Sequence, residues 1–191
     1  RLIGRLNGEF MLVADAQQEI RQAYVGGFMG QLVSGLVWLT TATVATFGSP
    51  RTAILLVVIG GMFIYPLTRL GLTAIGHRVA IAAENPLNGL AMQVAFTLPL
   101  ALPVVGAAAL YRLDWFFPAL MIILGAHYLP FVFLYGMRLF AVLCALLVSA
   151  GLGLALYAPP SFSAGAWLTS GLLLAFAFAG RWIALREAPG R

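Results

Sequence analysis

The chain has 191 residues, of which 62% are hydrophobic and only 9% charged, whereas a soluble domain carries about 25% charged residues. A water-soluble globule of this length could not bury so much apolar surface, so the composition excludes a soluble enzyme, and one cysteine excludes a disulfide scaffold. The net charge of +5 comes from 11 arginines and no lysine, and these stand at the ends of apolar runs, which indicates a membrane protein and no nucleic-acid partner.

Residues 1–24 precede the first apolar run and mix charged with apolar side chains. Arg5 and Arg21 are basic members of this segment, and Asp15 and Glu19 are acidic ones. The mixture predicts a helix that lies on a membrane surface or against the cytoplasmic end of a bundle. We therefore expect residues 1–24 to form an amphipathic cytoplasmic arm.

Six apolar runs follow, each close to the 20 or so residues with which a helix crosses the hydrocarbon layer. The expected spans are residues 25–47, 52–68, 86–111, 115–136, 139–157 and 163–183. Several links between consecutive spans are only a few residues long, which makes neighbouring helices antiparallel. The predicted fold is all-α, an integral membrane bundle of six transmembrane helices within residues 25–184.

Helix-start signals agree with these boundaries. Ser49 and Asn85 are each followed directly by a proline, the arrangement of a capping side chain and a proline in the first turn. Asp114 is placed to cap the fourth span, and Ser161 or Ser163 to cap the sixth.

Residues 69–84, between the second and third spans, are too polar to cross a membrane. His77 and Arg78 stand there among Leu70, Leu72 and other apolar residues. We expect an interfacial half-helix in this segment, and a short re-entrant piece is the alternative.

The arginines predict the orientation of the bundle. Only Arg51 and Arg112 fall on one side, while the side of both termini holds nine. Those nine are Arg1, Arg5, Arg21, Arg69, Arg78, Arg138, Arg181, Arg186 and Arg191. Because basic residues remain in the cytoplasm, both termini, including the tail 185–191, are expected there.

Small residues four apart allow helices to approach closely, and three spans carry such series. They are Gly26, Gly30 and Ser34, then Ala145, Ser149 and Gly153, then Gly171, Ala175 and Ala179. These series predict contacts within the bundle, and a homodimer interface is the alternative.

His127 is the one ionisable side chain in the middle of a predicted span, and such groups are functional candidates by default. Pro130 follows it closely and predicts a kink, which would open a polar gap. The candidate ligand-binding residues are His127, Gln93, Tyr65, Tyr128, Gln31 and Thr97. The alternative is a neutral histidine that bonds a neighbouring hydroxyl or amide and only holds the bundle together.

Other chemistry is poorly supported. No Asp or Glu lies inside a span, so the carboxylate relay of an ion-coupled pump is missing. His77, His127 and Cys144 are scattered, so we expect no metal and no cofactor. Around Ser34 the chain also lacks the Gly-x-Ser-Gly elbow of rhomboid-type proteases, so no catalytic residue is assigned.

The segments SGLVW at 34–38, GGMF at 60–63, NPL at 85–87 and GAHYLPF at 125–131 resemble a family of small multi-pass bacterial membrane proteins of unknown function. The resemblance implies a compact bundle in the bacterial inner membrane and transfers no activity. We expect a protein that contacts the lipid bilayer and binds or passes a small molecule near His127. The alternative is a scaffold or accessory subunit that docks a partner protein or anionic lipid, and an intramembrane enzyme is least favoured.

Overall fold

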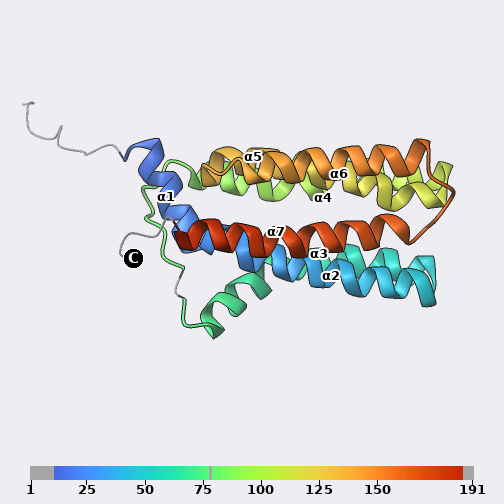
Figure 1. Cartoon of the computed structure of the whole chain (residues 1–191), viewed down its shortest axis with the longest axis horizontal. Helices are drawn as coiled ribbons and strands as arrows, with labels where there is room; N and C mark the ends of the chain where they lie inside the picture. Colours follow the sequence, from blue (N-terminus) through green and yellow to red (C-terminus); the bar gives the residue numbers. More distant parts are fainter. Residues whose placement is uncertain (1–10, 78, 187–191) are drawn as a thin grey trace, which may run out of the picture.

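The computed structural model describes residues 11–77 and 79–186, and this part of the chain is helical without any strand (Figure 1). Its elements in order are α1 (Val13–Ala23), the 3₁₀ turn η1 (Val25–Gly27), α2 (Phe28–Phe47), α3 (Pro50–Ala74), α4 (Asn88–Tyr111), the 3₁₀ turn η2 (Leu113–Trp115), α5 (Phe116–Tyr135), α6 (Leu139–Leu156) and α7 (Ala164–Arg186). The predicted all-α class is therefore confirmed.

Six helical segments, α2 to α7 with the 3₁₀ turns that lead into two of them, are long and apolar enough to cross a membrane. They coincide with the six predicted spans to within a few residues at most ends. The first ten residues of the predicted arm, Arg78 and the tail from residue 187 lie outside the described residues.

The prediction of a half-helix over residues 69–84 is wrong. Residues 69–74 continue α3 without a break, because Leu72 is fully buried beside Phe28 and Met29 and extends the packed face of the helix. The helix ends where Gly76 adopts a φ of +75° and the backbone N–H of His77 donates to the carbonyl of Leu72 at 2.9 Å. This is a Schellman ending, and the described residues beyond it form no helix before α4.

The predicted caps have mixed outcomes. Ser49 caps α3, since its hydroxyl accepts from the backbone N–H of Thr52 at 3.1 Å, and Ser161 accepts from Ala164 at the start of α7. The expectation for Asp114 is wrong, because its carboxylate lies 2.7 Å from the Arg112 guanidinium and binds that cation instead.

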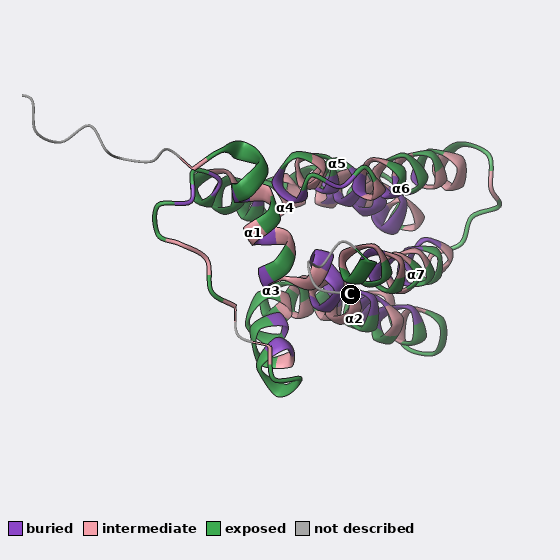
Figure 2. Cartoon of the chain, turned by 60° about the vertical axis from the view of Figure 1, so that its left-hand side comes forward, coloured by how far each residue is buried: buried purple, intermediate pink, exposed green. Residues whose placement is uncertain are grey.

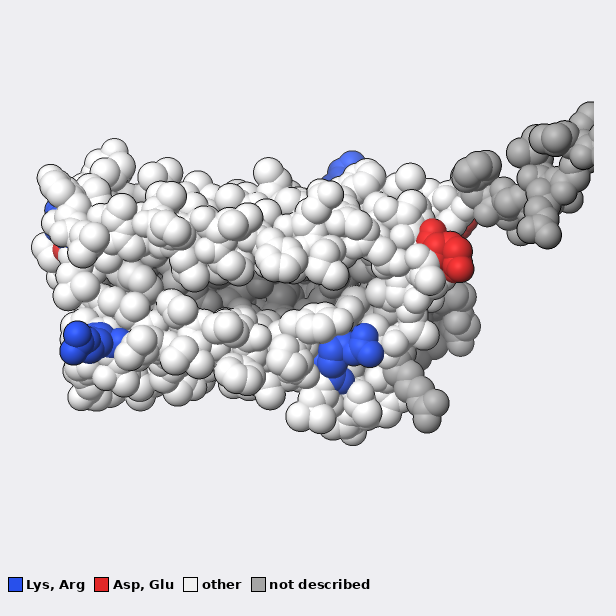
Figure 3. Space-filling model, turned by 180° about the vertical axis from the view of Figure 1, so that it is seen from behind, with Lys and Arg blue, Asp and Glu red and all other residues white. Residues whose placement is uncertain are grey.

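The six long helices form two layers of three, visible in Figure 1 as an upper and a lower group. In one layer α2 packs between α3 and α7, and in the other α5 packs between α4 and α6. The layers meet where α6 and α5 contact α7, whereas α3 and α4 form no comparable contact at the opposite edge. Figure 3 shows a long hollow between the layers, which we call the α3/α4 cleft.

Aromatic side chains fill the interior, and buried residues lie on the helix faces that look toward the middle of the molecule (Figure 2). Phe117 of α5 is fully buried, and its ring centroid lies 5.8 Å from that of Trp38 on α2. Phe140 of α6 is also fully buried and stacks on Tyr128. The Trp38–Phe117 pair joins the two layers, and the Tyr128–Phe140 pair joins α5 to α6 within one layer.

Glycines allow the closest helix contacts, but they are only partly the predicted ones. A Cβ added at Gly26 would lie 2.7 Å from the carbonyl oxygen of Gly180, so η1 and α7 touch backbone to backbone. By contrast, a Cβ added at Gly153 or Gly171 would meet nothing within 4 Å. The small-residue series on α6 and α7 therefore do not mark tight contacts at these two positions.

Helix α1 lies across one end of the bundle, which we call the α1 end (Figure 2). The Gln17 side-chain amide donates to the carbonyl of Phe133 at the end of α5. The Glu19 carboxylate accepts from the backbone N–H of Ala82 at 2.8 Å and from the Asn85 amide at 2.6 Å. Through these bonds α1 ties α5 to the loop that joins α3 to α4.

Candidate functional site

His127 lies on α5 and is half-buried, with Thr97 of α4 as its hydrogen-bond partner. The ring Nδ1 and the Thr97 hydroxyl oxygen are 2.9 Å apart, and the hydroxyl also donates to the carbonyl of Val94 at 2.8 Å. A hydroxyl has a single proton, so both bonds form together only if Nδ1 carries a hydrogen and donates it. In the neutral imidazole with its hydrogen on Nδ1, Nε2 is an acceptor.

A histidine that only stabilises the bundle needs a hydrogen-bond partner, which Thr97 supplies. A histidine that binds a ligand must also be partly exposed, and His127 is. Phe131 is the nearest ring to the imidazole, with centroids 5.2 Å apart. Helix α5 continues through Pro130 as one helix to Tyr135. His127 therefore lies at the wall of the bundle between an aromatic interior and a polar face of α4.

The polar face of α4 consists of Gln93 and Thr97, which stand one turn apart and are both exposed. Pro99 has no backbone N–H, so the carbonyl of Ala95 lacks its ordinary partner in the helix. Pro103 has the same effect on the carbonyl of Pro99. The Ala95 carbonyl lies about 200° around α4 from Thr97, so it is on a different face of the helix from the contact with His127.

Tyr128, next to His127 in sequence, belongs to a different environment. It is buried, and its phenol interacts with the Ser34 hydroxyl of α2. Tyr135 lies near enough to Tyr128 and Tyr24 to interact with both electrostatically. Tyr24 in turn interacts with Tyr65 of α3. These four tyrosines form a series of phenols, which we call the phenol series, from the middle of the bundle to the α1 end.

A cation, Arg69, lies beside the outer members of the phenol series, Tyr24 and Tyr65. Burial raises the pKa of the Tyr24 phenol above its ordinary value, and Tyr65 raises it further, while Arg69 acts in the opposite direction. Tyr65 and Arg69 are one turn apart on α3 and are both exposed. Tyr24 and Tyr135 are not among the predicted site residues, because the interaction that joins them exists only in the folded bundle.

Gln31 is buried, with 3% of its surface exposed, and neither atom of its amide has a hydrogen-bond partner among the described residues. The hydroxyl of Thr41, on the same face of α2 and fully buried, also lacks one. A buried polar atom without a hydrogen-bond partner destabilises the fold, so such atoms mark positions where a polar partner would stabilise it. A Cβ added at Gly180 would lie 3.7 Å from the Gln31 oxygen, so this amide faces α7.

The structure therefore divides the candidate residues between two neighbouring environments. His127 and Thr97 are joined directly at the wall of the bundle, with Gln93 one turn away on α4. Tyr128 and Tyr65 belong to the phenol series, and Gln31 lies in the contact between α2 and α7. No three side chains of His, Cys, Asp or Glu come together in the part of the chain that the structure describes.

One protein-family model matches residues 13–181, which is most of the chain, and its description is a family of unknown function, DUF7010. The chain belongs to the DUF7010 family. No curated protein and no solved structure matches it. Membership confirms the predicted resemblance to a family without an assigned activity, so it assigns no reaction or ligand to this DUF7010 protein.

The contact partner of His127 bears on which chemistry this DUF7010 protein can perform. Nucleophilic catalysis by serine or cysteine requires that residue within hydrogen-bond reach of the base. The observed partner is the secondary hydroxyl of Thr97, whose proton is held by the Val94 carbonyl. The Thr97 hydroxyl therefore donates to a backbone carbonyl and does not donate to His127, which is not the arrangement of an activated nucleophile.

Proposed function

We propose that this protein is a multi-pass membrane protein that binds or passes a small molecule through the α3/α4 cleft beside His127. The observation that carries the proposal is the hydrogen bond between half-buried His127 and exposed Thr97, which occupies Nδ1 and leaves Nε2 of the neutral ring as an acceptor. A polar face on α4 stands beside this pair in a bundle whose two layers are separated at one edge. Ligands of helix bundles commonly occupy such gaps between helices.

The side chains favour a neutral ligand that carries a hydrogen-bond donor. None of the six long helices contains Asp or Glu, so a cation in the cleft would have no counter-charge on them. The Nε2 of the neutral His127 ring is an acceptor, and Gln93 supplies both a donor and an acceptor. A small polar molecule with an N–H or O–H group matches this set.

We also propose that the α1 end faces the cytoplasm. Of the described arginines, five belong to the α1 end and its flanking segments, and two belong to the opposite end. The five are Arg21, Arg69, Arg138, Arg181 and Arg186. This excess of basic residues supports a cytoplasmic position for both ends of the chain.

Thiol labelling tests the cleft directly, because Cys144 is the single cysteine and Cys144→Ser removes it. In that background we compare Thr97→Cys with Phe96→Cys, which lies about 100° away around the same helix and is 58% exposed. We expect a charged, water-soluble methanethiosulfonate to modify Thr97→Cys in membrane vesicles and to leave Phe96→Cys unmodified, as in lipid. Equal reactivity at the two positions, or none at Thr97→Cys, would refute a wet cleft.

Binding itself is tested through His127. His127→Phe removes the acceptor but keeps an aromatic ring of similar size. We expect small molecules that co-purify with the wild-type protein in native mass spectrometry to be lost from His127→Phe and kept by Tyr157→Phe, an exposed aromatic at the far end of α6. If the two variants retain the same molecules as wild type, His127 serves only to hold the bundle together.

A further inference from the structure

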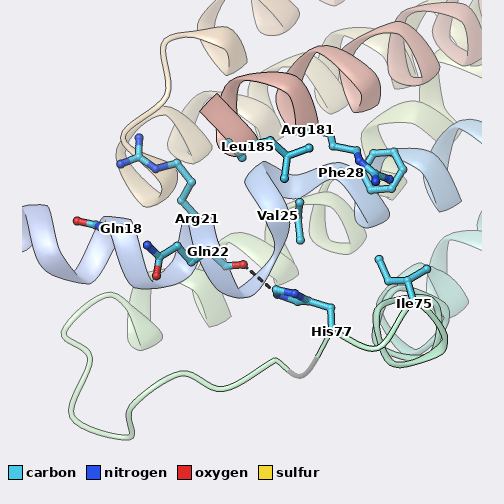
Figure 4. A pocket seen from close by; sticks show the side chains of 10 residues that line it. Gln18, Arg21, Gln22, Val25, Phe28, Ile75, His77, Arg181 and Leu185 are labelled. Atoms are coloured by element: carbon cyan, nitrogen blue, oxygen red, sulfur yellow. Dashed lines mark hydrogen bonds between the residues drawn. The ribbon is translucent and has the colours of Figure 1, made fainter. Parts of the chain in front are cut away.

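A pocket of about 610 Å³ opens at the α1 end, away from His127, and three separate parts of the chain form its walls (Figure 4). Its lining includes Arg21 of α1, Val25 of η1, Phe28 of α2, His77 beyond α3, and Arg181 and Leu185 of α7. No acidic residue is among the lining residues in the described part of the chain. The pocket therefore joins cationic groups to apolar walls.

Arg181 is placed at the pocket by the closest backbone contact of the fold. Gly26 and Gly180 approach so tightly that a Cβ on either would lie within 3 Å of the other's carbonyl oxygen. This contact positions the next residue, Arg181, with its guanidinium 4.8 Å from the centre of the Phe28 ring. A stacked guanidinium keeps its N–H groups in the plane of the fork, where they can bind an oxyanion.

His77 closes the side of the pocket opposite α7. Its Nε2 lies 3.0 Å from the carbonyl oxygen of Gln22, and because a carbonyl only accepts, Nε2 carries the hydrogen. The dashed line in Figure 4 marks this bond, which joins the segment after α3 to the last turn of α1. Figure 4 also shows Arg21 and Arg181 on opposite sides, with Val25 between them.

The surroundings place the pocket at the boundary of a membrane. Ile75 and Leu185, both on its rim, are exposed apolar side chains. Trp182 is also exposed, and the Arg186 guanidinium lies 3.6 Å from the centre of its ring. Tryptophan and arginine are typical of the layer in which lipid headgroups lie, so the pocket is at headgroup depth with apolar groups directed toward the chains.

We propose that this pocket binds the phosphate of an anionic phospholipid headgroup, with Arg181 as its principal ligand. The phosphate would meet the guanidinium, and the glycerol and first methylenes of the acyl chains would lie along Val25, Ile75 and Leu185. A soluble phosphate ester would use the same cation but gain nothing from these apolar walls. Basic pockets at this depth between helices are suited to acidic lipid headgroups.

The test uses delipidated full-length protein in detergent and native mass spectrometry of bound phosphatidylglycerol, with phosphatidylcholine and inorganic phosphate as parallel probes. We compare Arg181→Gln with Arg51→Gln, an arginine at the opposite end of the bundle. Because one arginine near a headgroup is worth about 1 kcal/mol, we expect phosphatidylglycerol affinity to fall about fivefold in Arg181→Gln. It should be unchanged in Arg51→Gln and largely kept in Arg181→Lys, which retains the charge.

Several results would overturn the assignment. Equal binding of phosphatidylglycerol by Arg181→Gln and wild type would remove Arg181 from the site. Equal affinity for phosphatidylcholine, which has the same phosphate but also a choline cation, would show that the pocket does not select an anionic headgroup. Displacement of phosphatidylglycerol by an equal concentration of inorganic phosphate would make this a site for a free anion. Arg181 is exposed, and Gln and Lys both favour helix, so we expect neither substitution to disturb the fold of α7.

Discussion

The contact between Gly26 and Gly180 predicts a large effect from one methyl group. In Gly180→Ala the new Cβ would lie 2.9 Å from the Gly26 carbonyl oxygen, whereas ordinary contacts begin at 3.4 Å. The overlapped atom belongs to the backbone, so the overlap is relieved only by separating η1 from α7. Overpacking of this kind costs about 1–3 kcal/mol of the free energy of unfolding.

Gly171→Ala is a matched control on the same helix. A Cβ there meets nothing within 4 Å, so the substitution adds only the helix propensity of alanine, about 0.5–1 kcal/mol, which Gly180→Ala receives equally. The difference between the two variants therefore isolates the contact. It corresponds to a factor of roughly 5 to 150 in the unfolding equilibrium.

The assay is reversible unfolding in mixed micelles by titration with sodium dodecyl sulfate, followed by circular dichroism and tryptophan fluorescence. We expect Gly180→Ala to unfold at a clearly lower detergent fraction than Gly171→Ala. Gly26→Ala should be at least as unstable, since its φ of +64° also strains an alanine. If Gly180→Ala and Gly171→Ala have the same midpoint, α7 does not approach η1 as closely as the structure indicates.

Three further predictions concern the ends of the bundle. Glu19→Ala removes the acceptor of the Asn85 amide, so we expect a loss of about 2 kcal/mol in the opening free energy of the loop before α4, measured by amide hydrogen exchange; unchanged protection would contradict it. Trp167→Phe removes the 3.0 Å bond from the indole N–H to the Thr46 hydroxyl and should cost about 0.5–1.5 kcal/mol in the same unfolding titration, and no change would mean that this bond contributes nothing. Because the folded-state pKa of Tyr24 is raised, its contribution to stability is fully present below the unfolded pKa, near 10, and is lost as the pH rises through the folded value. Unfolding titrations at pH 9 and 11.5 should therefore show a smaller decline for Tyr24→Phe than for wild type, and equal declines would exclude the shift.

The sequence predicted candidate site residues only where the residue type and its position in a span were informative by themselves. His127 is recognisable because a mid-span histidine is rare, and hydroxyl-bearing Thr97 is one of few polar residues on a neighbouring span. The pairing of these two required the contact between α4 and α5. The pocket around Arg181 could not be predicted, because its walls come from three segments far apart in the chain.

The loop between α3 and α4 illustrates the same limit. Apolar residues at 70, 72, 75, 79 and 81 have the spacing of a short amphipathic helix, which is why one was expected there. Leu72 is instead buried as part of α3, and Glu19 of α1 holds the backbone N–H of Ala82 that a helix would have used. Tertiary hydrogen bonds to α1 thus replaced the local ones.

Composition and hydropathy alone determined the class of this protein, its six long apolar helices and the ends of most of them. Those properties depend on each segment's own length, apolar content and capping residues, since every backbone group of a helix in lipid must be satisfied within the segment itself. Which helices touch, where the layers separate and which arginine reaches which ring depend on backbone approach at single glycines such as Gly26 and Gly180. Only the folded chain decides these contacts, because lipid surrounds all apolar faces alike and leaves close packing to choose among them.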